Sequence, residues 1–175
     1  MARVMATNDA LSEAPIPDTL NPQALTDTYV RMTRLIERLH RRHLDMLRFE
    51  LDRLEVDGIS AAQALILTKI QGQTIGVRDL VERGYYLGAN ASYNIKQMVA
   101  CDLIAQERSP HDRRATRLKL TEKGEALCRQ IAEAEKFHAA ALTKDLGDLS
   151  EIDNACTVLK SLETTWSNYL RYGDH

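Results

Sequence analysis

The sequence predicts a mainly α-helical protein that carries one small β-hairpin. Aromatic residues make up only 5% of the 175 residues, whereas the helix formers Ala, Leu, Glu and Arg are frequent. Apolar residues recur at steps of three and four over most of the chain, which is the period of a helix with one buried face. Residues 103–120 instead alternate apolar and polar side chains on either side of a Ser/Pro/Asp cluster, as the strands of a hairpin do.

The composition excludes several classes of protein. With 44% hydrophobic and 27% charged residues, the chain has the composition of a globular protein and not of a disordered one. No uncharged apolar run reaches the roughly 18 residues that a membrane span requires, and residues 1–20 lack the apolar core of a signal peptide. Three widely separated cysteines argue against a disulfide framework or a CxxC metal site. We therefore expect a cytoplasmic protein without a cofactor or a metal.

The N-terminal part predicts an arm and one long helix. Residues 1–20 are small and polar, with two prolines and no periodicity, so we expect a flexible arm. Asn21 and Pro22 mark the helix start, because Asn caps free amides and Pro in the first position loses no hydrogen bond. The apolar stripe continues to about Leu54, a length of roughly 45–50 Å at 1.5 Å per residue. This exceeds the needs of one small globule, so we assign residues 21–58 to dimerisation.

Residues 59–123 predict a compact segment of short elements. The stretch 60–63 (SAAQ) has the form of a capping box that opens a helix. Asp102 is expected in the left-handed conformation just past a helix end, because Asp tolerates it better than most residues. The predicted elements, in chain order, are helices from Ser60 to Gly72, near 77–83 and from 91 to about Cys101, and strands at 103–108 and 115–120.

Residues 124–175 predict two more helices, which complete the dimerisation region. Thr121 can cap the first of them, Gly147 interrupts it, and Ser150 can cap the second. The last helix has an apolar stripe, and so has the first. We expect both stripes to be buried between two subunits. Packing of both helices within one subunit is the alternative. The candidate dimerisation residues are Leu35, Leu39, Leu159, Leu162, Trp166, Tyr169 and Leu170.

Short helices followed by a basic hairpin give the order of a winged helix-turn-helix. In that fold a short helix enters the major groove of DNA, and the hairpin, or wing, lies along the backbone or the minor groove. The charge distribution agrees, since residues 76–123 hold nine Lys/Arg against six Asp/Glu, while residues 124–175 hold five against nine. Positive charge is thus concentrated where contact with an anionic polymer is expected.

The helix predicted from residue 91 has two faces. Ala91, Ile95, Met98 and Val99 form an apolar face that is expected to pack inward. On the other face, amides offer paired donors and acceptors to adenine, lysine reaches guanine or phosphate, and tyrosine can contact a thymine methyl. A solvated helix surface that is polar by chance is the alternative. The candidate base-contacting residues are Asn90, Ser92, Tyr93, Asn94, Lys96 and Gln97.

The hairpin carries five cations, which are four arginines and Lys119. Arginine suits contacts with phosphates and with a narrow minor groove. Asp112 is expected to pair with one of the two arginines at the tip and to fix the loop. A charged edge that prevents aggregation between strands is the alternative. The candidate wing residues are Arg108, His111, Asp112, Arg113, Arg114 and Arg117.

Residues 110–124 (PHDRRATRLKLTEKG) resemble the wing signature of the MarR family of bacterial regulators, D-x-R followed by a strand and L-T-x-x-G. Residues 60–63 and 77–80 fall where this family places its second and third helices. Over roughly residues 22–172, the resemblance implies a helical homodimer that binds a pseudo-palindromic operator and often holds a small effector. It also implies that Asp112 and Arg114 brace the wing and that Arg113 contacts DNA. Residues 84–94 are similar to the LdtR-like subgroup, regulators connected with cell-wall remodelling.

Two further features are candidates for regulation. His40 and His43 share a helix face beside three arginines, whose charge opposes a metal ion, so they are assigned to an effector pocket or else remain solvated. Oxidation of Cys101 would disturb the helix that it closes, although no basic activator adjoins it in sequence.

No nucleophile elbow, P-loop or dinucleotide-binding glycine pattern is present, so we expect no enzyme. The sequence instead predicts a homodimeric regulator that binds double-stranded DNA at the bacterial nucleoid and responds to a small-molecule effector, with no membrane contact. The competing prediction is a helical scaffold whose basic hairpin binds an acidic protein. Repression and activation both remain open.

Overall fold

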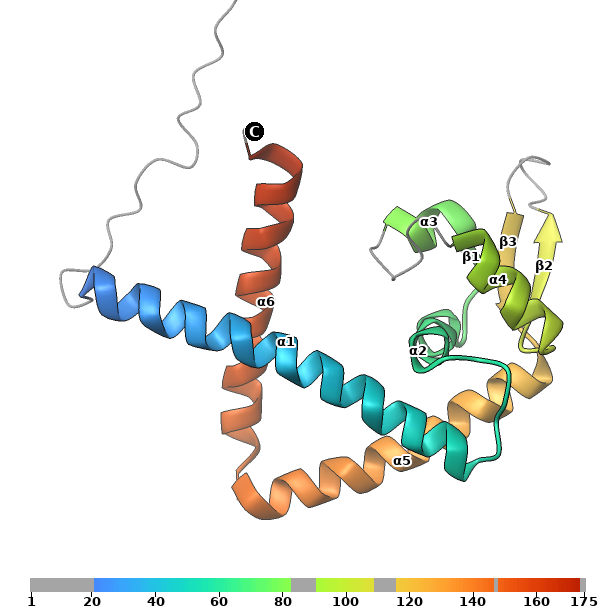
Figure 1. Cartoon of the computed structure of the whole chain (residues 1–175), viewed down its shortest axis with the longest axis horizontal. Coiled ribbons are helices and arrows are strands. Elements are labelled where there is room, and N and C mark those ends of the chain that lie inside the picture. The colour runs from blue at the N-terminus through green and yellow to red at the C-terminus, as the bar shows by residue number, and fades with distance from the viewer. Residues whose placement is uncertain (1–20, 83–90, 109–115, 147, 174–175) are drawn as a thin grey trace, which may run out of the picture. The chain divides into compact units, whose positions relative to one another are not determined.

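The computed structural model describes residues 21–82, 91–108, 116–146 and 148–173. Within these ranges it contains helices and a small β-sheet, as the sequence predicts (Figure 1). The helices are α1 (Pro22–Arg53), α2 (Ala61–Ile70), α3 (Val77–Glu82), α4 (Ala91–Ala100), α5 (Glu122–Leu146) and α6 (Leu149–Tyr172). The strands are β1 (Ile75–Gly76), β2 (Ile104–Arg108) and β3 (Thr116–Leu120). The arm predicted for residues 1–20 lies outside the described residues.

The chain divides into two compact units, residues 1–46 and 47–175, and the boundary falls within α1. The described part of the first unit is almost entirely helical. Asn21 caps this helix as predicted, because its Oδ1 accepts a hydrogen bond from the backbone N–H of Gln23 at 3.0 Å. The second unit holds the end of α1 and all the other elements.

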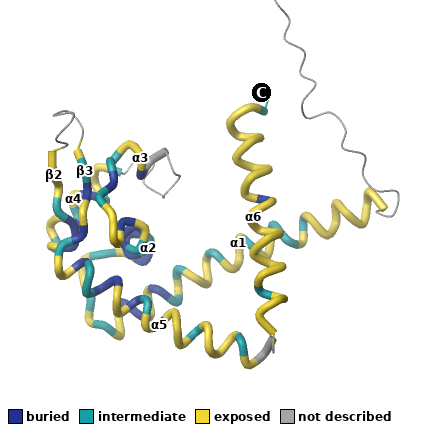
Figure 2. Tube along the Cα trace, turned by 180° about the vertical axis from the view of Figure 1, so that it is seen from behind, coloured by how far each residue is buried: buried dark blue, intermediate teal, exposed yellow. Residues whose placement is uncertain are grey.

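The core of the second unit joins the short helices and the sheet (Figure 2). Within it α2 packs on α5 and on β3, while α4 packs on β2. Each fully buried aliphatic side chain contributes about 1.5–3 kcal/mol. Burial also raises the pKa of the Cys128 thiol to about 11, so this thiol stays protonated at neutral pH and acts as a packing group. The largest fully buried side chains are Leu47, Leu67, Ile70, Leu80, Met98, Leu103, Ile104, Leu118, Cys128 and Ile131.

The sheet has three antiparallel strands in the order β1-β3-β2. The predicted hairpin is confirmed, with a register that runs from Ile104 opposite Leu120 to Arg108 opposite Thr116. The sequence pattern does not predict β1, which consists of two residues and places Ile75 opposite Leu118. This strand joins the chain before α3 to the middle of β3.

Local capping signals account for several helix ends. The capping box at the start of α2 is confirmed: Ser60 Oγ accepts from the Gln63 N–H at 3.2 Å, and Gln63 Oε1 accepts from the Ser60 N–H at 2.7 Å. Asp102 has a φ of 57°, the left-handed conformation predicted after α4. Thr121 caps α5 by accepting a hydrogen bond from the Gly124 N–H at 3.1 Å.

The predicted cap of the last helix was wrong by two residues. The N-cap of α6 is Asp148, whose Oδ1 accepts from the Ser150 N–H at 3.0 Å. The Ser150 hydroxyl donates to Asp148 Oδ2 at 2.6 Å. These hydrogen bonds from Ser150 hold the pKa of Asp148 below its usual value.

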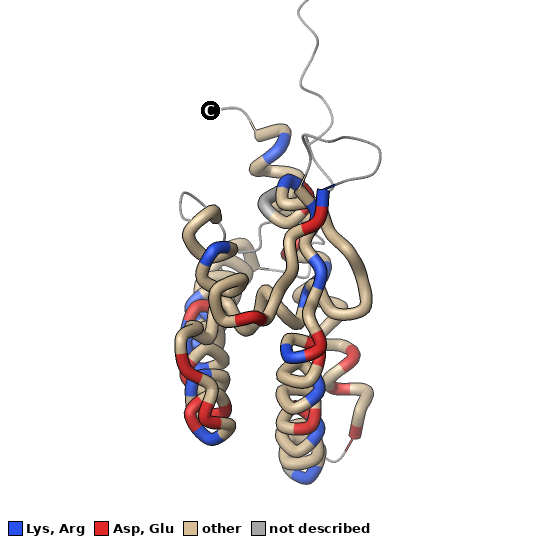
Figure 3. Tube along the Cα trace, turned by 90° about the vertical axis from the view of Figure 1, so that its right-hand side faces the viewer, with Lys and Arg blue, Asp and Glu red and all other residues tan. Residues whose placement is uncertain are grey.

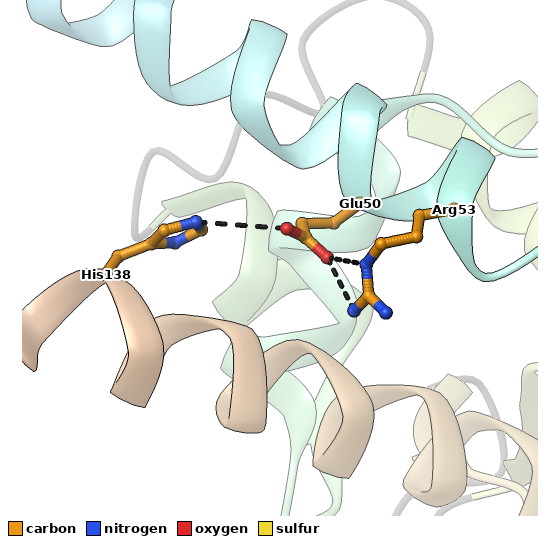
Figure 4. A network of polar contacts seen from close by, with 3 residues as sticks. All are labelled: Glu50, Arg53 and His138. Carbon is orange, nitrogen blue, oxygen red and sulfur yellow. Dashed lines mark hydrogen bonds and ion pairs between the residues drawn. The ribbon is translucent and has the colours of Figure 1, made fainter. Parts of the chain in front are cut away.

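A buried carboxylate links the end of α1 to α5 within the second unit (Figure 4). Glu50 is 7% exposed, and Arg53 places Nε and Nη2 each 2.8 Å from its Oε2. On the other side, His138 Nε2 lies 3.8 Å from Glu50 Oε1. Because a buried charge is costly unless it is paired, Arg53 is the contact that makes this carboxylate tolerable.

Gly124 lies where α5 meets the loop after α4, and the backbone there leaves no room for a side chain. A Cβ on Gly124 would collide with the carbonyl oxygen of Leu103. That oxygen cannot move away freely, because it accepts a hydrogen bond from the Thr121 N–H at 3.1 Å. The glycine of the L-T-x-x-G signature therefore has a packing role.

We predict that Gly124→Ala lowers the free energy of unfolding by about 1–3 kcal/mol, as overpacking does. Helix propensity alone would raise it by roughly 0.5–1 kcal/mol, so the sign of the change separates the two effects. Urea denaturation followed by circular dichroism measures it. Gln130→Ala, at an exposed position of α5, is the control and should change stability by less than about 0.5 kcal/mol. A Gly124→Ala protein more stable than the parent would contradict the packing role.

Candidate nucleic-acid interface

Helix α4 is anchored on one side and exposed on the other. Ile95 and Met98 are 3% and 0% exposed, and α4 packs on β2. Tyr93 is 65% exposed, and Ser92 and Lys96 are also exposed. Val99, predicted to pack inward, is instead 38% exposed, because it lies at the margin of the apolar stripe. Asn90 lies outside the described residues.

Asn94 and Gln97 differ from the other polar residues of α4, because both contact α2. Gln63 Nε2 donates to Asn94 Oδ1 at 3.1 Å and to Gln97 Oε1 at 3.2 Å. Gln97 Nε2 in turn donates to the carbonyl oxygen of Gly58 at 2.7 Å. Both side chains are half-buried, at the edge of the exposed face and not at its centre.

The sequence did not predict the contact of Gln63 with α4. Gln63 was identified as the partner of Ser60 in the capping box, a role that uses only the oxygen of its amide. A buried glutamine at that helix position still has two N–H donors to satisfy, and this is the signal that points to a tertiary partner.

The cations on the two strands of the hairpin differ in exposure and in hydrogen bonding. Arg108 is exposed at the far end of β2, and Lys119 is exposed on β3. Arg117 is half-buried, and its Nη2 donates to the carbonyl oxygen of Thr74 at 3.2 Å, which ties β3 to the segment before β1. Figure 3 views the molecule from the hairpin side and shows positive and negative residues close together there. One such opposite pair is Arg117 and Glu107.

The tip of the hairpin lies outside the described residues. The roles assigned there from the sequence therefore stay predictions, including the brace between Asp112 and Arg114. The residues concerned are His111, Asp112, Arg113 and Arg114. The stretch that carries the resemblance to the LdtR-like subgroup, residues 84–94, is likewise mostly outside, and the subgroup stays a prediction.

The two histidines assigned to an effector pocket lie on α1 in the first unit. His40 is half-buried and His43 is exposed. A hollow of about 860 Å³ along the same helix is lined by residues between Asp27 and Arg38 and includes neither histidine. Among the described residues, no three His, Cys, Asp or Glu side chains come together as metal ligands would. The effector pocket stays a prediction.

The residues assigned to dimerisation leave apolar surface exposed in the single chain. On α6, Leu162 is 8% exposed, while Tyr169 and Leu170 are 60% and 80% exposed. Leu159 and Trp166 on α6, and Leu35 and Leu39 on α1, are also more than a third exposed. Large exposed apolar side chains at helical spacing are typical of a surface that another molecule covers.

Cys101, the candidate for redox regulation, is half-buried, and its Sγ lies 3.5 Å from the carbonyl oxygen of Gly58. In the described part of the chain, no helix is both long enough and apolar enough to cross a membrane.

Comparison with known proteins identifies the family. A model described as MarR family matches residues 57–115, which include α2, α3, α4 and β2. The exopolysaccharide II synthesis transcriptional activator ExpG of Rhizobium meliloti (strain 1021) is 37% identical over 161 residues, covering 92% of this chain and 82% of that protein.

Solved structures show the same fold. A cysteine-to-serine variant of MarR from E. coli, complexed with operator DNA, matches with a TM-score of 0.65 and 24% identity, over 79% of this chain and 97% of that one. FabT of Streptococcus pneumoniae in complex with DNA matches with a TM-score of 0.63 and 19% identity, over 80% and 98%. Because it matches the family model, shares 37% identity with a transcriptional activator and has the winged helix-turn-helix fold, this chain belongs to the MarR family, whose members are transcription regulators and not enzymes.

Proposed function

We propose that this protein is a homodimer that binds a pseudo-palindromic operator in double-stranded DNA, in the bacterial cytoplasm, and that a small-molecule effector releases it. The observation that carries the proposal is the two-sided α4, in which Met98 is buried while Tyr93 and Lys96 are exposed. A helix held in this way can enter a major groove without loss of its packing.

The contacts divide into two kinds. Ser92, Tyr93 and Lys96 are the exposed side chains of α4 that can reach base edges, and Asn90 is added from the sequence. The wing supplies phosphate contacts that weaken with salt and carry little sequence information. We assign this second role to Arg108 and Lys119, to His111 from the sequence and to Arg113 from the resemblance, which also implies that Asp112 and Arg114 brace the wing.

The exposed apolar residues of α6 and α1 support the dimer. A twofold symmetric dimer would place two copies of α4 about 34 Å apart, one turn of the double helix, and would explain a pseudo-palindromic operator. Residues 21–58 and 124–175 would form the dimerisation region around the DNA-binding segment 59–123.

An effector can release the DNA only if it binds the released geometry better than the DNA-bound one. His40 and His43 are the residues that we would replace first in a search for its site. The name of the relative ExpG makes genes of exopolysaccharide synthesis the first targets to examine, and activation the first direction to test, with repression as the other outcome.

The test of DNA binding begins with selection from a random duplex library by the purified protein. We expect Arg113→Ala to weaken binding to the selected duplex and to random duplex alike, because a phosphate contact is independent of sequence. We expect Tyr93→Ala to cost about tenfold on the selected duplex and less on random duplex, as a base contact does. Fluorescence anisotropy across a salt series measures both.

Equal losses for Tyr93→Ala on both duplexes would contradict a base contact by α4. Binding to an acidic protein but to no duplex would favour the alternative function, a scaffold whose basic hairpin docks a protein partner.

The two described arginines of the hairpin should behave differently. We expect Arg108→Gln to reduce the salt dependence of DNA binding by about one counterion and to leave stability unchanged, because Arg108 is exposed. We expect Arg117→Gln to lower the free energy of unfolding by about 1 kcal/mol, because it loses the bond to the Thr74 carbonyl. Thermal melts and salt titrations of both variants check the assignment, and the reverse pattern would refute it.

The dimer has its own test. We expect the double variant Leu159→Glu/Leu170→Glu to weaken dimerisation by at least roughly 100-fold, because burial of unpaired carboxylates costs several kcal/mol. Sedimentation equilibrium should then report a mass near 19.8 kDa in place of twice that value. Lys160→Glu, on the same helix at an exposed polar position, is the control and should remain a dimer. A dimeric double variant would exclude this face as the interface.

A further inference from the structure

We propose that Gln63, a buried residue of α2, determines which bases Asn94 accepts. Gln63 acts as a positioning residue that turns the amide of Asn94 so that its donor and not its acceptor is available to DNA. This inference rests on the proposed binding of α4 to base edges.

The hydrogen bonds of Gln63 fix the direction of its own amide. Gln63 is 3% exposed, and its Oε1 accepts from the backbone N–H of Ser60 at 2.7 Å. A backbone N–H can only donate, so a flipped amide would place two donors against each other. Nε2 of Gln63 must therefore point away from Ser60, toward α4.

The direction of the Gln63 amide determines how the amides of Asn94 and Gln97 on α4 are oriented. Gln63 Nε2 can only donate, and it contacts Asn94 Oδ1 at 3.1 Å and Gln97 Oε1 at 3.2 Å. The other end of the network confirms the direction, since Gln97 Nε2 lies 2.7 Å from the carbonyl oxygen of Gly58, which can only accept. Two backbone groups of opposite polarity thus determine the orientation of all three amides.

The consequence concerns the chemistry that Asn94 offers. A free asparagine reads adenine with both arms of its amide, one as acceptor and one as donor. In this protein the Oδ1 arm of Asn94 is held by Gln63, and the Nδ2 arm is the one left for a base. A donor alone complements acceptor edges, which are O6 and N7 of guanine, N7 of adenine or O4 of thymine, and it finds no partner on the major-groove edge of cytosine.

Gln97 is restricted further, because both its oxygen and its nitrogen are engaged. We therefore assign Gln97 to the support of α4 and Asn94 to base selection. From the sequence alone, both residues were expected to offer a paired donor and acceptor to adenine.

The test changes the polarity of Gln63 and measures base preference. Gln63→Glu keeps the capping box, since Glu serves there as well as Gln. Its second oxygen would face Asn94 Oδ1 and Gln97 Oε1, so the amide of Asn94 must turn its donor inward, whereas the Gly58 carbonyl still holds Nε2 of Gln97. Gln63→Met keeps the volume and removes the polarity, so the amide of Asn94 is no longer oriented.

The full-length variants select duplexes from a random library, and sequencing gives the preference at each base pair. We expect Gln63→Glu to shift one position of each half-site about tenfold from guanine or thymine toward cytosine, whose exocyclic amine donates and whose major-groove edge offers no acceptor. We expect Gln63→Met to reduce the preference at that position about tenfold. Gln71→Glu, which adds the same charge at an exposed position after α2, should weaken binding without changing any preference.

Asn94→Asp gives an independent readout, because its side chain presents only acceptors and lies at the surface edge. It should reproduce the preference of Gln63→Glu, and it decides the matter if the Gln63 variants do not fold, as judged by circular dichroism. Unchanged preferences in the folded variants, with a parent protein that selects a clear motif, would overturn this inference alone. A parent protein that selects no motif would overturn the proposed function and the inference together.

Discussion

The burial of one side of α4 is the constraint on which the rest of the candidate interface depends. Ile95 and Met98 enter the core that also holds Leu118 of β3 and Ile104 of β2. Each such side chain contributes about 1.5–3 kcal/mol, enough to keep the helix on the sheet through thermal fluctuations. Because helix and hairpin share this core, the exposed face of α4 and the exposed cations of the strands keep a fixed relation within the second unit.

Hydrogen bonds then refine what the apolar packing positions. The contact between α2 and α4 includes the buried amide of Gln63, which is costly unless its groups are satisfied. The hydrogen bonds of Gln63 turn the oxygen of Asn94 inward and leave its donor for a base, while Gln97 is held at both ends of its amide. Burial of apolar groups thus decides where α4 lies, and the polar network decides what it offers. The same division holds in the hairpin, where Arg117 supports the sheet and Arg108 remains exposed.

The sequence predicted features that a few neighbouring residues decide, such as the capping box at Ser60, the cap at Asn21 and the left-handed Asp102. It did not predict β1, because two residues have no period, and it placed the cap of α6 at Ser150, because serine and aspartate are equally good caps. The inward turn of Asn94 and Gln97 depends on a glutamine 31 and 34 residues away, which no local pattern reveals.

Photocrosslinking from the centre of the exposed α4 face tests whether this face meets the bases of DNA. A photoreactive aromatic residue replaces Tyr93 in one protein and Lys136, on the exposed side of α5, in another. We expect position 93 to crosslink to the bases of a selected duplex, unlabelled duplex to compete, and position 136 not to react. Crosslinks from position 136 without any from position 93, in protein that binds the duplex, would contradict a contact between this face and the bases.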